Sequence, residues 1–286
     1  MIVLACLLMI FVRYSEIGLK STPVRLRFEN RLKENIMSML AQEGIEALVT
    51  KNESRFYVET NDELSAVNAL RRVFGIASIS VATVCSSEMG SICEAVTQYS
   101  LDRIFKGQSF AVKARREGDH DYNSMDVGRE AGSAIFIANQ EKGVKVDLTN
   151  PDKVFFVEVR RNKAFIFDRY IKCHGGLPIG TQGKVLAEIE NDRSIVSAWL
   201  MMKRGCKVYT KGNYAEILRK YDPELKHIEK ETPRNILGIS LGKSFEELES
   251  VNVSDYDVPV FMPTVGMDDD KVSGMMKIIK EEIPLD

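Results

Sequence analysis

The residues whose types and spacing point most clearly to a possible binding site form a short turn between an apolar segment and an amphipathic one. They are Ile189, Glu190, Asn191, Asp192, Arg193 and Ser194. A turn between a strand and a helix can bind phosphate when it offers free backbone N–H groups, glycines that allow close approach, and a helix N-terminus. No glycine occurs between Gly183 and Gly205, and the Glu190 carboxylate would repel phosphate. Asn191 or Asp192 can instead cap the helix that follows. The residue types therefore predict a structural turn.

A second glycine-containing turn lies just before it, at residues 180–184 (GTQGK). A Walker-type phosphate loop would need glycine at Pro178 and serine or threonine at Val185. We therefore interpret residues 180–184 as a turn that leads into a strand.

Nucleophilic and metal-ligating residues are sparse. The five cysteines, at 6, 85, 93, 173 and 206, include no C-x-x-C pair, and the three histidines, at 120, 174 and 227, complete no zinc pattern. Cys173 and His174 are adjacent, but neighbours in sequence rarely converge in space. Cys206 has the character of a small buried hydrophobe. We expect no metal site and no catalytic residue, and free thiols of this kind fit a reducing cytoplasm.

Basic residues could contact a nucleic-acid backbone, because Lys and Arg release condensed counterions when they neutralise phosphates. Six of them lie between Arg13 and Lys33, and others gather near residues 113–120 and 160–163. Each could equally be a solvated surface charge. Aromatic residues are rare in these groups, so we expect recognition of RNA shape and backbone rather than unpaired bases. The candidate RNA-binding residues are Lys20, Arg25, Arg27, Lys113, Arg115, Arg116, His120, Arg129, Arg160 and Arg161.

The first 80 residues predict the order strand, helix, strand, strand, helix, strand, which is the ferredoxin-like arrangement. The apolar start is shorter than the ~20 residues that span a bilayer, and we interpret residues 9–14 as a buried strand. Thr22 is a plausible helix cap before Pro23. Phe28, Leu32 and Ile36 then mark the buried face of that helix, and strands follow at 45–50 and 55–60. A second helix carries Leu64, Val67 and Leu70.

A second region, residues 81–175, predicts a helix at 88–105, a strand at 110–115, a helix capped by Ser124, and strands near 144–148, 154–160 and 163–169. In the strand at 110–115, Phe110, Val112 and Ala114 face one side. Gly128 and Gly132 could permit close packing of the helix. The two regions thus predict mixed α+β structure.

The last third alternates strands (184–189, 206–210, 235–240, 258–261) with helices (193–204, 213–220, 244–249 and one near the end). Alternation of this kind predicts a parallel sheet covered by helices, and therefore a multidomain α/β and α+β protein. Residues 190–286 carry 14 Lys and Arg against 18 Asp and Glu, so this part is acidic.

Residues 175–184 (GGLPIGTQGK) resemble the hinge of the tRNA 4-thiouridine synthase (tRNA sulfurtransferase) family. The blocks FAVKARREGDH and VDLTNPDKVFFVEVRRNKAFIF resemble its THUMP domain, and VRYSEIGLKSTPVRLRFENRL and LRRVFGIASIS resemble its N-terminal ferredoxin-like domain. The resemblance implies three domains: ferredoxin-like (1–80), THUMP (81–175), and a shortened Rossmann-like ATPase-type domain (176–286). In that family a Ser-Gly-Gly-x-Asp-Ser loop holds ATP. Alignment on VSAWLMMKRG places residues 189–194 over this loop, and only Ser194 matches.

The resemblance implies a cytoplasmic protein that binds tRNA by its acceptor arm, with a possible homodimer and no membrane. Because the loop is degenerate and no sulfur-transferring cysteine pair is present, we expect no ATP-dependent adenylation, no sulfur transfer and no cofactor. A separate modifying enzyme could then act on the bound tRNA. Two alternatives stay open: an active ATP-dependent tRNA sulfurtransferase with an atypical site, and an RNA-independent scaffold that acts through the acidic C-terminal part.

Overall fold

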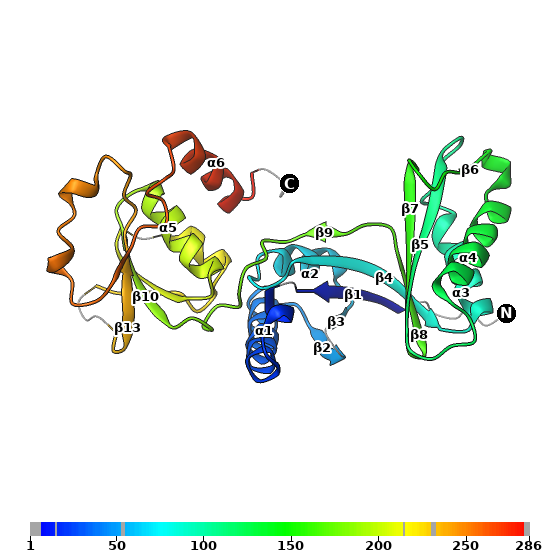
Figure 1. The fold of residues 1–286 in the computed structure, drawn as a ribbon, viewed down its shortest axis with the longest axis horizontal. Coiled ribbons are helices and arrows are strands. Elements are labelled where there is room, and N and C mark those ends of the chain that lie inside the picture. Colours follow the sequence, from blue (N-terminus) through cyan, green and yellow to red (C-terminus); the bar gives the residue numbers. More distant parts are fainter. Residues whose placement is uncertain (1–6, 15, 53–54, 214, 230–232, 283–286) are drawn as a thin grey trace. The chain divides into compact units, whose positions relative to one another are not determined.

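The computed structural model describes residues 7–14, 16–52, 55–213, 215–229 and 233–282. The chain divides into two compact units (Figure 1). One unit contains residues 1–11, Tyr57–Thr60 and Ser80–Ile171, and the other contains Val12–Phe56, Asn61–Ile79 and Lys172–Asp286. The first six residues, which include Cys6, lie outside the described part.

The N-terminal elements follow the predicted ferredoxin-like order: β1 (Leu7–Arg13), α1 (Thr22–Gln42), β2 (Ala47–Asn52), β3 (Arg55–Thr60), α2 (Glu63–Arg71) and β4 (Ser78–Ser86), with a 3-10 turn at Glu16–Leu19. The strands lie in the order β2-β3-β1-β4. Phe28, Leu32 and Ile36 are buried on α1, as predicted. The predicted cap is wrong by one residue: Ser21 precedes α1 and makes no side-chain capping bond. Leu64 is 75% exposed, because α2 buries its alanines with Val67 and Leu70.

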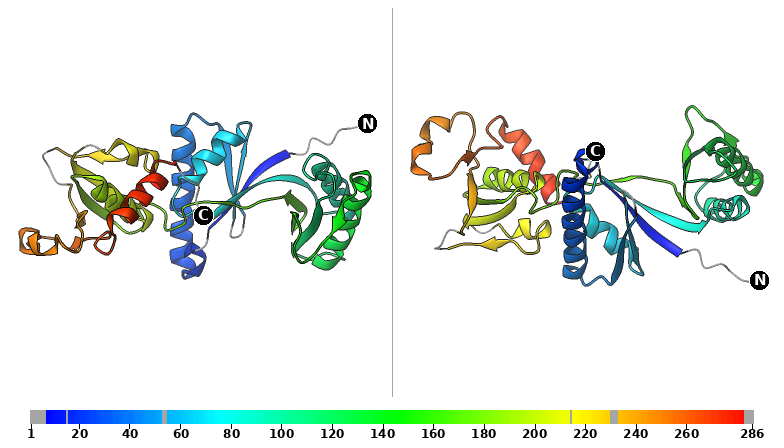
Figure 2. Two further views of the ribbon diagram at one scale, coloured as in Figure 1. Left: turned by 90° about the horizontal axis from the view of Figure 1, so that it is seen from above. Right: turned by 60° about the horizontal axis from the view of Figure 1, so that its bottom comes forward.

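The central elements are α3 (Met89–Ser100), β5 (Ser109–Glu117), α4 (Ser124–Ala138), β6 (Lys145–Val146), β7 (Lys153–Arg160), β8 (Lys163–Phe167) and β9 (Ile171–Lys172), with a 3-10 turn at Gln140–Lys142. β5 pairs in parallel with β6 and β7, and β7 pairs antiparallel with β8. Figure 2 shows α3 and α4 side by side on one face of these strands. Phe110, Phe155 and Ile135 are fully or almost fully buried in the core between them.

Four predictions for this region need correction. The helix predicted to reach residue 105 ends at Ser100, and the strand predicted at 144–148 has only two residues. Asn123, not Ser124, caps α4, because its side chain accepts from the backbone of Asp126, whose carboxylate accepts in return. The Cβ of an alanine at Gly128 or Gly132 would meet its nearest neighbour at 3.9 Å, so close packing does not require glycine there.

The C-terminal elements are β10 (Lys184–Ile189), α5 (Asp192–Lys203), β11 (Lys207–Gly212), β12 (Lys226–His227), β13 (Ile236–Ser240), β14 (Val260–Phe261) and α6 (Asp269–Ile279). Their strands form a parallel sheet in the order β12-β11-β10-β13-β14, which confirms the predicted α/β architecture. The helices predicted at 213–220 and 244–249 are wrong. Only 3-10 turns form there, at Glu216–Lys220 and Leu248–Ser250, with another at Val253–Asp255.

The hinge-like segment is firmly bonded rather than a free linker. Gly75 N donates to Gly175 O at 2.8 Å, and Gly175 N donates to Ile76 O at 2.8 Å. Gly176 (φ +77) lies so close to the C-terminal turn of α5 that an added Cβ would stand 2.2 Å from Lys203 O. Phe74 then packs edge-on against Trp199 with ring centroids 5.1 Å apart. Phe74, which follows α2, is therefore part of the hydrophobic core of the parallel sheet within the second unit.

Candidate functional site

The parallel sheet has a topological switch point at β10, because β11 lies on one side of it and β13 on the other. In open α/β sheets, ligands bind in the crevice outside the carboxyl ends of the strands at such a point. In this chain the crevice would be bordered by the turn at 189–194 after β10 and by residues 241–243 after β13. The switch point therefore defines the candidate nucleotide site.

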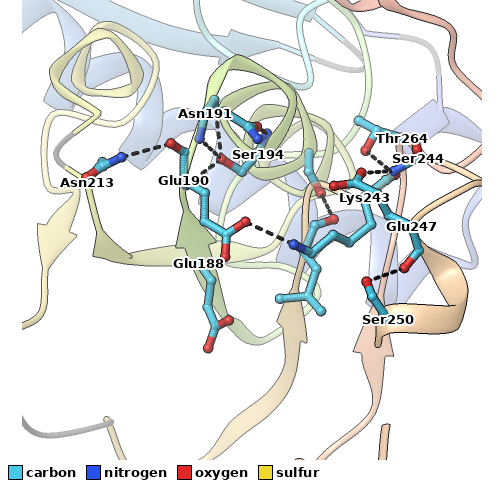
Figure 3. A network of polar contacts seen from close by, with 12 residues as sticks. Glu188, Glu190, Asn191, Ser194, Asn213, Lys243, Ser244, Glu247, Ser250 and Thr264 are labelled. Carbon is cyan, nitrogen blue, oxygen red and sulfur yellow. Dashed lines mark hydrogen bonds and ion pairs between the residues drawn. The ribbon is translucent and has the colours of Figure 1, made fainter. Parts of the chain in front are cut away.

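Backbone N–H groups of the turn at 189–194 form hydrogen bonds within the turn itself. Glu190 N and Asn191 N both donate to Ser194 Oγ, at 2.8 and 3.0 Å. Ser194 N donates to Asn191 Oδ1 at 3.1 Å, and Ile195 N donates to Asn191 O at 3.2 Å (Figure 3). These bonds confirm the predicted capping by Asn191, while Asp192 is the first residue of α5. The N–H groups of Glu190, Asn191 and Ser194 are thus satisfied within the turn and are not available to a phosphate.

Arg193 turns its guanidinium away from the turn and into the segment before α6. Its Nη1 donates to Thr264 O at 3.1 Å and to Met267 O at 2.6 Å, and its Nη2 lies 2.7 Å from Asp269 Oδ1. Arg193 is 9% exposed, so these contacts are largely shielded from water. The side chain anchors a segment more than 70 residues away along the chain.

The crevice itself is occupied by the protein. A Cβ added at Gly242 would stand 2.2 Å from Ser194 Cα, so the backbone after β13 lies directly against the start of α5. Behind it, Ser197 Oγ lies 2.8 Å from Ser240 Oγ and donates to Leu241 O. A phosphate group has no room between these two backbone segments.

One ion pair, between Lys243 and Glu190, lies beside the crevice (Figure 3). Lys243 Nζ lies 3.0 Å from Glu190 Oε2, and this carboxylate raises the pKa of the Lys243 ammonium. Tyr256 donates to Glu188 Oε2 at 3.4 Å. Two carboxylates therefore stand at the C-terminal end of β10, where a nucleotide would place its phosphates, and like charges repel.

Sequence reasoning missed the part that Gly242, Lys243 and Thr264 play at this site. The run Ser240-Leu-Gly-Lys-Ser244 carries a glycine immediately after a strand, which is a signal for close backbone approach. The partner of that glycine lies on α5, and no local pattern could indicate it.

The first group of candidate RNA-binding residues lies at the start of α1. Lys20 and Arg27 are exposed and Arg25 is half-buried. The first turns of α1 and α3 have no acidic residue, whereas α2, α4 and α5 each carry one there and α6 carries two. Since the N-terminus of a helix attracts anions, uncapped N–H groups and three basic side chains together produce a positive surface.

The second group lies around the ends of β5 and β7. Arg115, Arg116 and Arg160 line a shallow hollow of about 430 Å³. Arg115 and Arg116 are exposed, but Arg160 pairs with Glu117 and Glu158 and is only 14% exposed at its side chain. Among the described residues, no carboxylate lies within ion-pair distance of Arg115 or Arg116, so the hollow offers two exposed guanidinium groups beside one that is paired.

The remaining candidates are dispersed. Lys113 is exposed on the sheet face opposite the helices, as its alternation with Val112 predicts. His120 Nε2 lies 2.5 Å from Arg161 O at the tip of the β7–β8 hairpin, so this imidazole braces the tip. Arg129 is exposed on α4 but pairs with Asp126 and Glu130. Arg13, which belongs to the N-terminal basic run, is only 8% exposed.

The sulfur and imidazole groups do not form a reactive pair. Burial raises the pKa of the Cys173 thiol to about 12 and that of Cys206 above its ordinary value. His174 packs against Phe74, Trp199 and Tyr221, and burial, with the nearby charges of Lys203 and Arg71, lowers its pKa to about 4. The two thiols and the imidazole are therefore neutral near pH 7, as expected for side chains buried in a hydrophobic core.

Within the described residues, no group of three His, Cys, Asp or Glu side chains is arranged to hold a metal ion. Across the same part of the chain, no helix is long and apolar enough to cross a membrane.

Two family models match the sequence: the ThiI ferredoxin-like domain over residues 9–80 and the THUMP domain over residues 86–168. A probable tRNA sulfurtransferase of Methanosarcina acetivorans is 40% identical over 203 residues, which cover 70% of this chain and 49% of that protein. A probable tRNA sulfurtransferase of Methanocaldococcus jannaschii is 33% identical over 268 residues, which cover 86% of this chain and 68% of that protein. The chain spans about half the length of the first of these relatives.

Two solved structures share the fold. The PH1313 protein of Pyrococcus horikoshii aligns with a TM-score of 0.81 at 26% identity, covering 96% of this chain and 99% of that one. A 4-thiouridine synthetase solved in complex with RNA and with bound ATP aligns with a TM-score of 0.76 at 23% identity, covering 96% of this chain and 85% of that one.

Proposed function

The chain belongs to the tRNA sulfurtransferase family, and we propose that it binds tRNA but does not carry out ATP-dependent activation and sulfur transfer itself. The chain would hold a folded tRNA by its acceptor arm in the cytoplasm, where a separate modifying enzyme acts on it. The match covers only about half of the length of these relatives named as sulfurtransferases, so their complete activity does not transfer directly to this chain.

The state of the turn at 189–194 carries the proposal that ATP is not used. The N–H groups of Glu190 and Asn191 are bonded to Ser194, that of Ser194 is bonded to Asn191, and the backbone of Gly242 lies against the start of α5. Binding of a triphosphate would require breaking these bonds and displacing the segment that Arg193 holds. Glu190 adds a negative charge at the same place.

Two features support RNA binding. The N-terminus of α1 combines basic residues with an uncapped helix end, and the β5 end exposes Arg115 and Arg116. The 4-thiouridine synthetase of similar fold was solved with RNA.

Fluorescence anisotropy with labelled tRNA at several salt concentrations tests this part. Each lost phosphate contact should lower the slope of log affinity against log salt by about 0.9. Arg25→Gln with Arg27→Gln, and separately Arg115→Gln with Arg116→Gln, should therefore weaken binding and flatten the slope. Lys271→Gln, on exposed α6, is the control and should change neither. Absent binding, or binding without salt dependence, would refute the proposal.

A pyrophosphate-exchange assay tests the ATP part. We expect no tRNA-dependent exchange between ATP and labelled pyrophosphate. The specific alternative is an active tRNA sulfurtransferase, which is favoured by the retained Ser194 and by the intact α5 behind the turn. Exchange above background, together with loss of 4-thiouridine when the gene is deleted, would establish that alternative. Light scattering of the tRNA complex would also distinguish one copy per tRNA from a homodimer.

A further inference from the structure

A cavity of about 560 Å³ lies at the opposite edge of the parallel sheet from the crevice. Lys184 and Lys207, the first residues of β10 and β11, line it together with α1 and the segment after the 3-10 turn Glu216–Lys220. Its volume falls within the range of small-molecule sites. The candidate nucleotide site, by contrast, lies at the C-terminal ends of these strands. The cavity is therefore a separate feature.

The walls of the cavity are held in place by the protein. On one side Asn35 Nδ2, from α1, donates to Ile179 O at 3.2 Å. On the other side Lys207 Nζ lies 2.9 Å from Asp222 Oδ1. The apolar part of the lining is Ile179 and the half-buried Pro223, whereas Phe74 beneath them belongs to the buried core. The cavity therefore has fixed polar sides and a small apolar surface.

The charges on the walls do not cancel locally. The ammonium group of Lys207 pairs with two carboxylates, that of Asp222 and that of Glu224. Its Nζ lies 3.2 Å from Glu224 Oε2. Asp222 is only 5% exposed, and its Oδ2 has no hydrogen-bond partner among the described residues. This side of the cavity therefore carries an excess negative charge.

Lys184 supplies the complementary charge. It lies opposite Lys207 in the parallel register of β10 and β11, so the two side chains leave the sheet on the same face. Among the described residues, no carboxylate lies within ion-pair distance of Lys184, whereas Arg31 and Glu34, also in the lining, pair with each other at 2.8 Å. The lining thus presents one unpaired positive group and one negative excess.

From this arrangement we propose that the cavity binds a zwitterion of the α-amino acid class with an apolar side chain. The carboxylate of the ligand would pair with Lys184, and its ammonium would approach Glu224 in the negative field of Asp222. Its side chain would lie on Ile179 and Pro223. A ligand with only one of the two charges would leave one wall uncompensated.

Titration calorimetry of the full chain with L-phenylalanine, L-phenylalaninamide and 3-phenylpropanoate tests this assignment. The amide lacks the carboxylate and the acid lacks the ammonium, so each should bind at least about ten-fold more weakly than L-phenylalanine. L-leucine and L-methionine extend the series to other apolar side chains. No heat from any of the three amino acids up to about 20 mM would overturn the proposal.

Two variants assign the charges to residues. Lys184→Gln should lower the affinity for L-phenylalanine about ten-fold and leave the affinity for the amide unchanged. Glu224→Gln should lower the affinity for L-phenylalanine and leave the affinity for 3-phenylpropanoate unchanged. Lys226→Gln, which is exposed and outside the cavity lining, is the matched control. Thermal unfolding confirms that each variant folds. Equal affinity for all three ligands, or the same affinities in both variants as in the parent chain, would overturn the proposal.

Discussion

His174 should make the free energy of unfolding fall as the pH falls from about 7 to about 4. Its imidazole is 8% exposed and contacts the rings of Phe74, Trp199 and Tyr221, at centroid distances of 5.2 to 5.9 Å. Burial lowers its pKa from 6.5 to about 4. Between these values the unfolded chain binds a proton that the folded chain does not, so stability rises with pH through this window.

The size of the effect follows from the two pKa values. At about 1.36 kcal/mol per pH unit, the difference between 6.5 and about 4 corresponds to a maximum of about 3.4 kcal/mol, reached below pH 4. At pH 5 the loss relative to pH 8 should be about 2 kcal/mol. Above pH 7 both states hold a neutral imidazole, so His174 contributes no pH dependence there.

Urea unfolding followed by Trp199 fluorescence measures this loss, since Trp199 is the one tryptophan in the sequence and touches His174. The parent chain and the variant His174→Phe, which keeps an aromatic ring without a titrating group, are compared at pH 8 and pH 5. Contributions of all other groups cancel in the difference between the two proteins. An equal pH effect in both, or an NMR titration of His174 near pH 6.5, would refute the reasoning.

Three further perturbations test the closed crevice by chemical denaturation. Gly242→Ala should destabilise the chain by about 3 kcal/mol, because the new Cβ would overlap the backbone of Ser194. Gly274→Ala, in open space on α6, should stabilise the chain by about 0.7 kcal/mol. Similar effects of the two substitutions would contradict the close contact between Gly242 and Ser194. Arg193→Met should cost about 2 kcal/mol by leaving buried carbonyl groups unpaired, while Asp269→Asn, at a fully exposed partner, should cost a few tenths. Asn191→Ala should cost about 1 kcal/mol through loss of the cap, and an unchanged midpoint would exclude that role.

Most of the fold could be predicted because periodic burial and strand–helix alternation are local properties of the sequence. Phe28, Leu32 and Ile36 on α1 illustrate this. The helices that were wrongly predicted at 213–220 and 244–249 have too few buried residues: the 3-10 turn at Glu216–Lys220 buries only Leu218, and the turn at Leu248–Ser250 buries no residue. Short helices without tertiary packing are unstable in water, so propensity alone did not decide these segments.

The candidate site was predictable only in its local part. Capping by Asn191 follows from neighbours three residues apart. The bonds from Arg193 to Thr264 and Met267 join residues 71 and 74 positions apart, and the contact of Gly242 with Ser194 also depends on strand order. Sequence shows that a charge is reversed at position 193, but only the fold assigns a partner to the new charge.

The turn at 189–194 stabilises α5 with the groups that would otherwise bind phosphate. Ser194 Oγ accepts from two backbone N–H groups while donating to Asn191 O, so both donors are already committed. Arg193 then fixes the segment before α6, and Gly242 brings the end of β13 onto the same helix start. Because these contacts come from three separate segments, a glycine at position 191 would free only the N–H group of Ser194 and would leave the crevice filled. Under the proposed function, the closed crevice is therefore a property of the whole C-terminal fold rather than of one altered loop.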